Sequence, residues 1–319
     1  MIKWIVIFFV ILILILIIFY NLANWVEDKA LFHPSKKRCW KPRTQYKSVY
    51  LNVENKKDVC YNSKDKKKGC QYIHGWHFDN FEGAKTILFC HGNSGSINDR
   101  KYIIDICHKF KLNLFVFDII AFGLSSGCSP NKFFLKENGE TAFNYLHHHC
   151  GISNRQIIVW GESLGCVTAS FIASKHKCGA LIIFCGFSSL DDAVTYKFKG
   201  GKRTAVKFLT DLLAYRVDML DVKDYLLDVE CPVVIIHSPC DDIIPYSCSW
   251  INYHSVKHAD KMHVKIKGGH SSPNIKSCQL RKIFNFCNLS LDNLSSNVEI
   301  SEILENLKTF AKKHNNFMD

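Results

Sequence analysis

Two apolar patterns divide this chain. The first is an unbroken apolar run near the N-terminus, Trp4–Tyr20, which contains no charged residue and no side-chain amide. The second starts near residue 45, where short runs rich in Val, Ile, Leu and Phe alternate with longer segments whose apolar residues recur at helical spacing. The patterns predict one membrane-type segment and a separate body in which strands and helices alternate.

The body is predicted to be an α/β domain. Residues Tyr46–Val53 and Gln71–Phe78 are expected to form an antiparallel pair joined by a lysine-rich loop. The later strands are apolar throughout, which is typical of a buried parallel sheet, and are expected at Thr86–Cys90, Leu112–Asp118, Gln156–Trp160, Ala180–Cys185, Pro232–His237 and His263–Lys267. Helices are expected at Asn98–Phe110, Lys132–His148 and Ser163–Lys175. This alternation predicts a mostly parallel central sheet with helices on both faces.

The chain is expected to hold a single large domain behind the apolar run. We assign residues 1–26 to a transmembrane anchor, 27–44 to a basic juxtamembrane linker and 45–319 to the domain. Within the domain, residues 187–230 interrupt the strand series and are expected to form a small cap. Residues 271–296 are polar and rich in Ser and Asn, and a last helix is expected at Val298–Lys313.

The apolar run has the length of a membrane span. At about 1.5 Å per residue, a helix over Trp4–Val26 is roughly 34 Å long, enough to cross a hydrocarbon core of about 30 Å. Trp4, Tyr20 and Trp25 lie where interfacial aromatic residues are common. A cleaved signal peptide is the alternative, but its apolar region is shorter and ends in a small-x-small site. An uncleaved single-pass anchor is therefore predicted.

Charge next to the span predicts its orientation. Only Lys3 precedes it, whereas six basic residues follow it: Lys29, Lys36, Lys37, Arg38, Lys41 and Arg43. The positive-inside rule then places the catalytic body on the cytosolic side. Two Asn-x-Ser sequons, at Asn288 and Asn293, favour the alternative of a lumenal body.

The cysteines agree with a cytosolic body. There are 15 of them, an odd number, and none forms a CxxC pair. Several fall within apolar runs, where reduced cysteine acts as a small hydrophobic residue. A reducing compartment, no metal and no cofactor are therefore expected. The consecutive residues His147, His148 and His149 are not expected to be ligands, because they cannot share one helix face.

Composition excludes several classes of protein. With 47% apolar and 22% charged residues, the chain is neither a disordered polymer nor a polytopic membrane protein. Much of its net charge of +12 lies between Lys29 and Lys68. The lysines at 56–68 indicate a solvated loop that also attracts anionic lipid headgroups. Nucleic acid is not expected as a partner, because no helix-turn-helix, RNP or zinc signature accompanies the charge.

A candidate nucleophile follows the third parallel strand. Gly161-Glu162-Ser163-Leu164-Gly165 is a G-x-S-x-G sequence between a predicted strand and a predicted helix. In that context the serine occupies a sharp turn at the carboxyl edge of the sheet, where active sites of such sheets lie. Ser163 is therefore predicted to be a catalytic nucleophile.

Serine needs a base, and the base needs an acid to orient it. His270 follows the last strand on a glycine turn, and an Asp pair, Asp241 and Asp242, follows the strand before it. The order Ser, Asp, His and the placement after strands predict a triad of Ser163, Asp241 and His270. Asp242 remains the alternative acid; whichever carboxylate does not serve is expected to cap the following helix.

The developing oxyanion needs fixed donors. The backbone N–H of Leu164, next to the nucleophile, is one candidate, and the loop after Thr86–Cys90 supplies a second. In that loop we choose the N–H of Asn93, with Ser94 as the alternative, and expect His91 to brace the loop. A phosphate-binding loop is not expected, because the Walker lysine and the dinucleotide glycine spacing are absent.

In these blocks the sequence resembles the α/β-hydrolase superfamily, and most of all its membrane-anchored serine hydrolases, which include lipases, thioesterases and serine-aminopeptidase-like proteins. The resemblance covers roughly residues 45–275 and rests on HGNSG at 91–95, D-x-x-x-F-G-x-S-x-G at 118–127, GESLG at 161–165, FSSL at 187–190, the acid block that ends at Pro245, and GGH at 268–270. It implies the same triad and the same oxyanion amides. Ser238 stands where the family usually has glycine, and residues 119–121 read Ile-Ile-Ala in place of Tyr-Arg-Gly.

The expected activity is hydrolysis of carboxylic esters or thioesters in acyl or lipid-like substrates, through an acyl-enzyme. Phe187 and the aromatic pair Phe133–Phe134 are candidates for lining an acyl pocket. A serine peptidase acting on short peptides is one alternative, because the triad alone does not distinguish amides from esters. A non-catalytic scaffold tethered to the membrane is another. The natural substrate and protein partners are not readable from the sequence.

Overall fold

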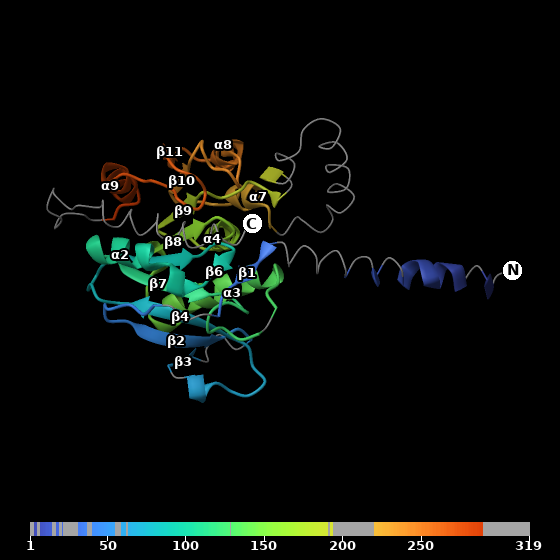
Figure 1. The fold of residues 1–319 in the computed structure, drawn as a ribbon. Helices are drawn as coiled ribbons and strands as arrows, with labels where there is room; N and C mark the ends of the chain where they lie inside the picture. The colour runs from blue at the N-terminus through green and yellow to red at the C-terminus, as the bar shows by residue number, and fades with distance from the viewer. Residues whose placement is uncertain are drawn as a thin grey trace.

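The computed structural model describes residues 3–4, 7–14, 17–18, 21, 31–36, 40–54, 59–61, 63–127, 129–190, 192–193 and 220–289. Its body is a twisted sheet covered by helices on both faces (Figure 1). Nine strands form the sheet in the order β11-β10-β9-β8-β5-β7-β4-β2-β3. Strands β1 and β6 pair with each other in parallel and form a separate two-stranded sheet.

Six neighbouring strands run parallel and supply the carboxyl edge at which the site lies. Strands β2 and β4, the predicted antiparallel pair, run antiparallel, and β4 also pairs antiparallel with β7. The mostly parallel α/β sheet predicted from the sequence is confirmed. The strands are β1 His33–Pro34, β2 Lys47–Asn52, β3 Val59–Cys60, β4 Tyr72–Phe78, β5 Thr86–Cys90, β6 Ser94–Gly95, β7 Asn113–Asp118, β8 Ile157–Glu162, β9 Ala180–Phe184, β10 Val233–His237 and β11 Lys261–Lys265.

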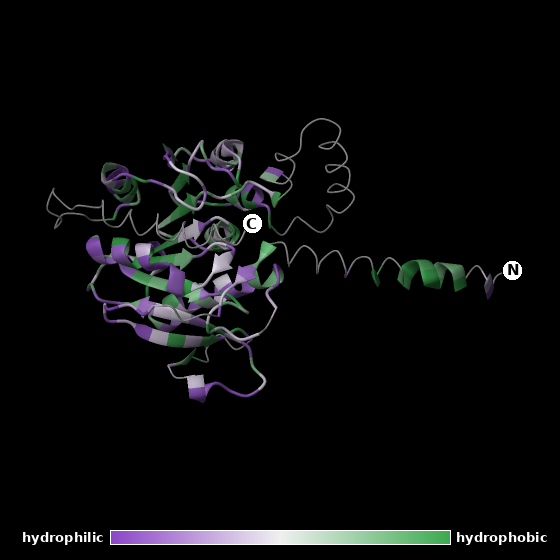
Figure 2. Cartoon of the chain, in the orientation of Figure 1, coloured by the Kyte–Doolittle hydropathy of each residue, from purple (hydrophilic) through white to green (hydrophobic). Residues whose placement is uncertain are grey.

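Successive side chains of these strands enter two different cores, because a strand alternates its faces. In β8, Val159 belongs to the core that includes residues of helices α3, α4, α7 and α8, while Ile158 belongs to the core that includes residues of α2 and α9. Figure 2 shows green, apolar residues in the central strands and mixed hydropathy along the surrounding helices. The helices are α2 Lys101–Lys109, α3 Phe133–Asn144, α4 Gly165–Lys175, α7 Val222–Leu226, α8 Tyr246–Ser255 and α9 Ser277–Phe286.

Short helical turns complete the elements: η1 Ser63–Asp65, η2 Ile97–Asp99, the π-type turn η3 Tyr145–His149 and η4 Asn154–Gln156. Two sequence expectations differ from the structure. The last strand ends at Lys265, two residues earlier than predicted, because its pairing with β10 ends there. The polar segment at 271–296, for which no helix was predicted, contains helix α9, whose Leu280, Ile283 and Phe284 are buried.

Several predictions fall on residues outside the described ranges. They are most of the small cap at 187–230 and the last helix at Val298–Lys313. The predicted span Trp4–Val26 is described only in part; residues 7–14 are helical and apolar, with exposed side chains (Figure 2). Within the described ranges, no helix has both the length and the apolar character needed to cross a bilayer.

Candidate active site

Ser163 lies at a strained turn between β8 and α4. Its φ is 52°, in the left-handed region that costs non-glycine residues energy. The flanking glycines permit this turn: a Cβ on Gly161 would lie 2.6 Å from the Cα of Cys166, and one on Gly165 would lie 2.0 Å from the carbonyl oxygen of Cys90. The N–H of Ser163 donates to the carbonyl of Phe184 at 2.9 Å. The turn therefore holds the serine at the carboxyl edge of the sheet.

The structure brings Ser163, His270 and Asp241 together although they are far apart in sequence. His270 Nε2 lies 2.9 Å from Ser163 Oγ, and His270 Nδ1 lies 2.8 Å from Asp241 Oδ2. A carboxylate only accepts hydrogen bonds, so Nδ1 carries the proton and Nε2 is free to accept from the serine hydroxyl. This is the tautomer that a general base needs.

Asp241 is held as an anion beneath His270. Burial alone would raise the pKa of Asp241, but the hydrogen bond from His270 and the backbone N–H of Ile244 together bring it below its usual value. Its other oxygen, Oδ1, accepts from Ile243 and Ile244 at 2.9 and 2.7 Å. The carboxylate can therefore orient the imidazole and stabilise its positive charge during proton transfer.

The neighbouring Asp242 has a different place from the one expected. It does not cap the following helix α8, whose N-cap position is Pro245 without a side-chain cap. Instead, Asp242 Oδ1 accepts from the backbone N–H of His270 at 3.0 Å. One aspartate thus contacts the histidine ring and the other fixes the histidine backbone.

A buried histidine also contacts the acid. Nε2 of His237, at the end of β10, donates to the carbonyl of Ile244 at 3.1 Å and lies 3.4 Å from Asp241 Oδ2. Burial lowers the pKa of His237, so the ring is neutral at neutral pH. Ser238 beside it donates from Oγ to the carbonyl of Gly268, which joins the acid turn to the histidine turn. A glycine at position 238 would lack this bond.

The proposed oxyanion loop, residues 91–95, packs against the nucleophile. A Cβ on Gly92 would lie 3.3 Å from Ser163 Cβ, so the backbone before Asn93 lies close to the serine and leaves little room for a side chain between them. Leu164 is at the first position of the turn into α4 and is buried. His91 Nδ1 donates to the carbonyl of Gly92 at 2.7 Å, as a bracing residue does. Both chosen amides therefore belong to backbone that lies beside Ser163.

Sequence reasoning missed a buried ionic cluster behind this loop. Glu162 Oε2 lies 2.9 Å from Arg100 Nε and accepts from the N–H of Gly92 at 3.3 Å, while Tyr102 donates to Oε1 at 2.6 Å. Burial alone would raise the pKa of Glu162, but Arg100, Tyr102 and the Gly92 N–H lower it. A second Arg100 nitrogen donates to the carbonyl of Ser94 at 3.0 Å. The cluster ties the nucleophile turn to the oxyanion loop.

This cluster predicts a pH-dependent stability effect. Glu162→Gln should cost about 3–5 kcal/mol of unfolding free energy at pH 7, because it leaves the buried Arg100 charge uncompensated. The ionised Glu162 carboxylate stabilises the fold at pH values above its usual pKa. This stabilisation is lost as the pH falls through the lowered pKa of Glu162 in the folded state. The difference in unfolding free energy between wild type and Glu162→Gln should therefore become smaller from about pH 5 downward. Urea unfolding across this pH range measures it.

The matched control is Asp105→Asn, which breaks the partly exposed Lys101–Asp105 pair on α2. A surface pair of this kind is worth less than about 1 kcal/mol. The ionic role of Glu162 is contradicted if Glu162→Gln loses as little unfolding free energy as the control, or if its loss stays constant with pH.

Other candidate residues lie in the core or at the surface. Phe187 is 4% exposed and packs in the core, with its carbonyl accepting from Asn252. Phe134 packs half-buried against the same core, whereas Phe133 is exposed. The thiols of Cys166 and Cys185 are buried, and burial raises the pKa of both. Neither is therefore a thiolate that competes with Ser163 as a nucleophile.

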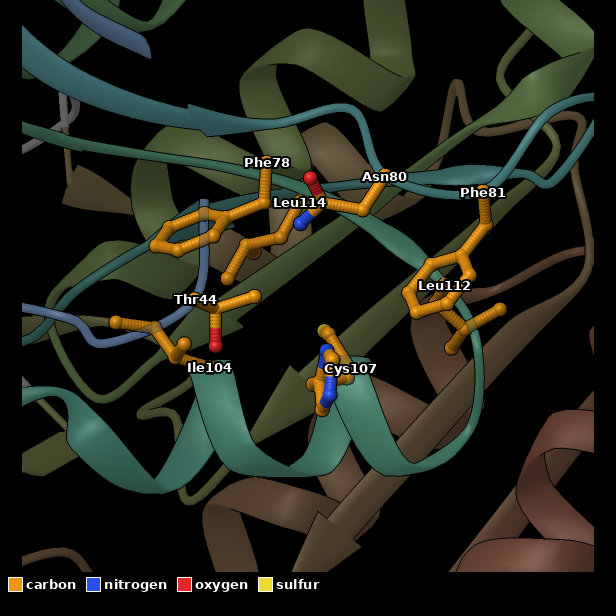
Figure 3. Close-up of a pocket in the computed structure, with 9 residues that line it drawn as sticks. Thr44, Phe78, Asn80, Phe81, Ile104, Cys107, Leu112 and Leu114 are labelled. Atoms are coloured by element: carbon orange, nitrogen blue, oxygen red, sulfur yellow. The ribbon is translucent and has the colours of Figure 1, made fainter. Parts of the chain in front are cut away.

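The described residues also line a small, open cavity on the α2 side of the sheet. Figure 3 shows Ile104 and Cys107 of α2 facing Phe78 and Leu114 across it. No triad or oxyanion residue lines this cavity. It is therefore separate from the candidate active site. In the same ranges, no group of three or more His, Cys, Asp or Glu residues is placed to hold a metal ion.

Two proteins of similar sequence illustrate what this chain resembles. Alpha/beta hydrolase domain-containing protein 17C of Mus musculus is 25% identical over 232 residues, 72% of this chain and 67% of that protein. Protein bem46 of Schizosaccharomyces pombe is 28% identical over 167 residues, 51% of this chain and 54% of that protein. This chain thus spans between about half and two thirds of the length of these relatives. No protein-family model matches the chain.

Solved structures agree on the fold. An esterase from Pyrococcus furiosus has a TM-score of 0.56 and 19% identity, over 88% of this chain and 98% of that one. An acetyl xylan esterase from Paenibacillus sp. R4 has a TM-score of 0.55 and 14% identity, over 83% and 92% of the two chains. The resemblance to the α/β-hydrolase superfamily inferred from the sequence motifs is confirmed at the level of the superfamily: this chain has the α/β-hydrolase fold, and it is similar in sequence to α/β-hydrolase domain-containing proteins.

Proposed function

We propose that this chain is a membrane-anchored serine hydrolase that cleaves ester or thioester bonds of acyl substrates. The single observation that carries the proposal is the series of hydrogen bonds from Ser163 through His270 to Asp241, at 2.9 and 2.8 Å. Reacting groups at these distances need no further rearrangement for proton transfer. The esterase-like structural neighbours support the same class of reaction.

In the proposed reaction, Ser163 Oγ attacks the acyl carbonyl carbon while its proton passes to His270 Nε2. Asp241 stabilises the imidazolium, and the N–H groups of Asn93 and Leu164 bind the oxyanion. The carbon–oxygen or carbon–sulfur bond then breaks, and His270 protonates the leaving alcohol or thiol. A water molecule, deprotonated by His270, releases the acid and regenerates Ser163.

The chain's geometry supports acyl substrates at a membrane surface. Phe32 is buried in the body beside the oxyanion loop. Only six residue steps separate it from Val26, where the proposed span ends, so the connection is at most about 21 Å long. The body, and with it the active site, is thereby tethered near the bilayer, where lipid esters and S-acylated proteins are concentrated. The basic residues that follow the span favour a body on the cytosolic side.

A substrate series tests this function. The full chain, reconstituted in lipid nanodiscs, is offered esters from acetyl to palmitoyl, S-acylated peptides, and the same peptides without an acyl group. We expect hydrolysis of esters and thioesters, with kcat/KM rising with chain length by about tenfold for each two or so added methylenes that are buried. Faster cleavage of the unacylated peptides supports a peptidase instead. A folded protein without any turnover supports a non-catalytic scaffold.

The anchor has its own test. Membranes that carry the full chain are washed with alkaline carbonate and then treated with protease in sealed vesicles of known orientation. We expect the protein to stay in the membrane fraction and its body to be digested from the cytosolic side. Extraction by carbonate contradicts the anchor, and a protected body contradicts the orientation.

A further inference from the structure

The segment that leads from the proposed span to the body is paired with the oxyanion loop. Residues 33–36, named here the N-terminal strap, include β1, which runs parallel to β6 in that loop. The N–H of His33 donates to the carbonyl of Asn93, and the N–H of Ser35 donates to the carbonyl of Gly95, both at 2.8 Å. The sequence pattern assigned these residues to a linker, but the structure pairs them with the loop.

The N-terminal strap is itself held firmly. Phe32, just before it, is buried with its ring 6.3 Å from that of Phe122, which lies 5.3 Å from the His91 ring. At the other end, Lys36 Nζ donates to the carbonyls of Ser125 and Gly127, both at 3.1 Å. The strap therefore has fixed positions on both sides of its pairing with the loop.

This pairing completes the support of the proposed oxyanion donor. On one side of Asn93, the Glu162 carboxylate accepts from the N–H of Gly92 at 3.3 Å. On the other side, the Asn93 carbonyl accepts from His33. The Asn93 N–H lies between these two bonded peptide groups and shares its own peptide group with the Gly92 carbonyl, which accepts from His91 at 2.7 Å. The direction of the Asn93 N–H therefore rests on all three bonds, and the strap supplies the one on its C-terminal side. An oxyanion donor depends on such fixed orientation.

We propose that the N-terminal strap is a positioning element of the active site, which aims the Asn93 N–H at the oxyanion. The proposal rests on the proposed function. The segment that connects the proposed membrane span to the body then also supports the catalytic site. Activity therefore depends on residues that lie outside the predicted hydrolase domain, at 33–36.

The test compares His33→Pro with His33→Ala in the full chain. Both remove the exposed imidazole, and only proline removes the backbone N–H that donates to the Asn93 carbonyl. Turnover of a soluble short-chain ester is measured per active site, with sites counted by fluorophosphonate titration. Loss of an oxyanion donor costs about 10²–10³ in kcat. For a misaimed donor we expect kcat of His33→Pro at least about tenfold below that of His33→Ala, with KM within about twofold.

Equal kcat per site in the two variants overturns the proposal, as does a fall in the number of sites alone, which indicates a merely structural role. If His33→Pro does not fold, Lys36→Met decides, because it loosens the strap and keeps the N–H. It should lower kcat severalfold at constant KM, and an unchanged kcat overturns the proposal. Wild-type protein without hydrolysis or labelling refutes the proposed function instead.

Discussion

Ser163→Ala should abolish ester hydrolysis and lower kcat by roughly 10⁶, the loss seen when a triad serine is removed from a serine hydrolase. The alanine keeps the turn but removes the hydroxyl that lies 2.9 Å from His270 Nε2. KM should change little, because the serine contributes chiefly to the transition state. Steady-state kinetics on a soluble ester measures the effect.

The matched control is Ser170→Ala, which removes a buried serine hydroxyl from the same helix, α4. The kcat of that variant should stay within about twofold of wild type, because the Ser170 hydroxyl makes no hydrogen bond to the described residues. Comparable activity of Ser163→Ala and Ser170→Ala contradicts the assignment of the nucleophile.

Asp241→Asn should lower kcat by about 10⁴. The asparagine keeps the shape but presents an N–H or a neutral oxygen to His270 Nδ1, so the ring is no longer held with its proton on that nitrogen. The imidazolium that forms during catalysis also loses its counter-charge. Steady-state kinetics at neutral pH, with unfolding measured in parallel, checks the prediction.

Asp242→Asn is the comparison that separates the two adjacent acids. Its amide oxygen can still accept from the His270 backbone N–H, so we expect a loss at least about a hundredfold smaller than that of Asp241→Asn. A larger loss in Asp242→Asn makes Asp242 the orienting acid, the alternative that the sequence left open.

Much of the fold was predictable because strand and helix periods are strong signals. The buried strand Thr86–Cys90 has the predicted bounds, and the antiparallel pairing of β2 with β4 follows the predicted hairpin. Helix α9 was missed because its apolar residues, Leu280, Ile283 and Phe284, lie among many polar ones. A single buried stripe is enough to dock a helix, yet it barely changes the composition of the segment.

The candidate site was partly predictable for a different reason. The triad residues follow strands, and parallel strands bring their carboxyl ends to one edge. Their supports left no such signal. Glu162 resembles any polar residue within G-x-S-x-G, and its partner Arg100 is an ordinary basic residue until folding buries it against Glu162. The pairing of His33 with Asn93 uses backbone groups only, so no side-chain pattern records it.

The proposed acyl-enzyme chemistry has one most direct test. The full chain is incubated with a fluorophosphonate, digested, and analysed by peptide mass spectrometry, with Asp241→Asn and Ser163→Ala in parallel. We predict a single stoichiometric phosphonyl adduct on the peptide that carries Ser163, formed much more slowly in Asp241→Asn and absent in Ser163→Ala. An adduct on another residue, or none on folded protein that hydrolyses esters, would contradict Ser163 as the nucleophile.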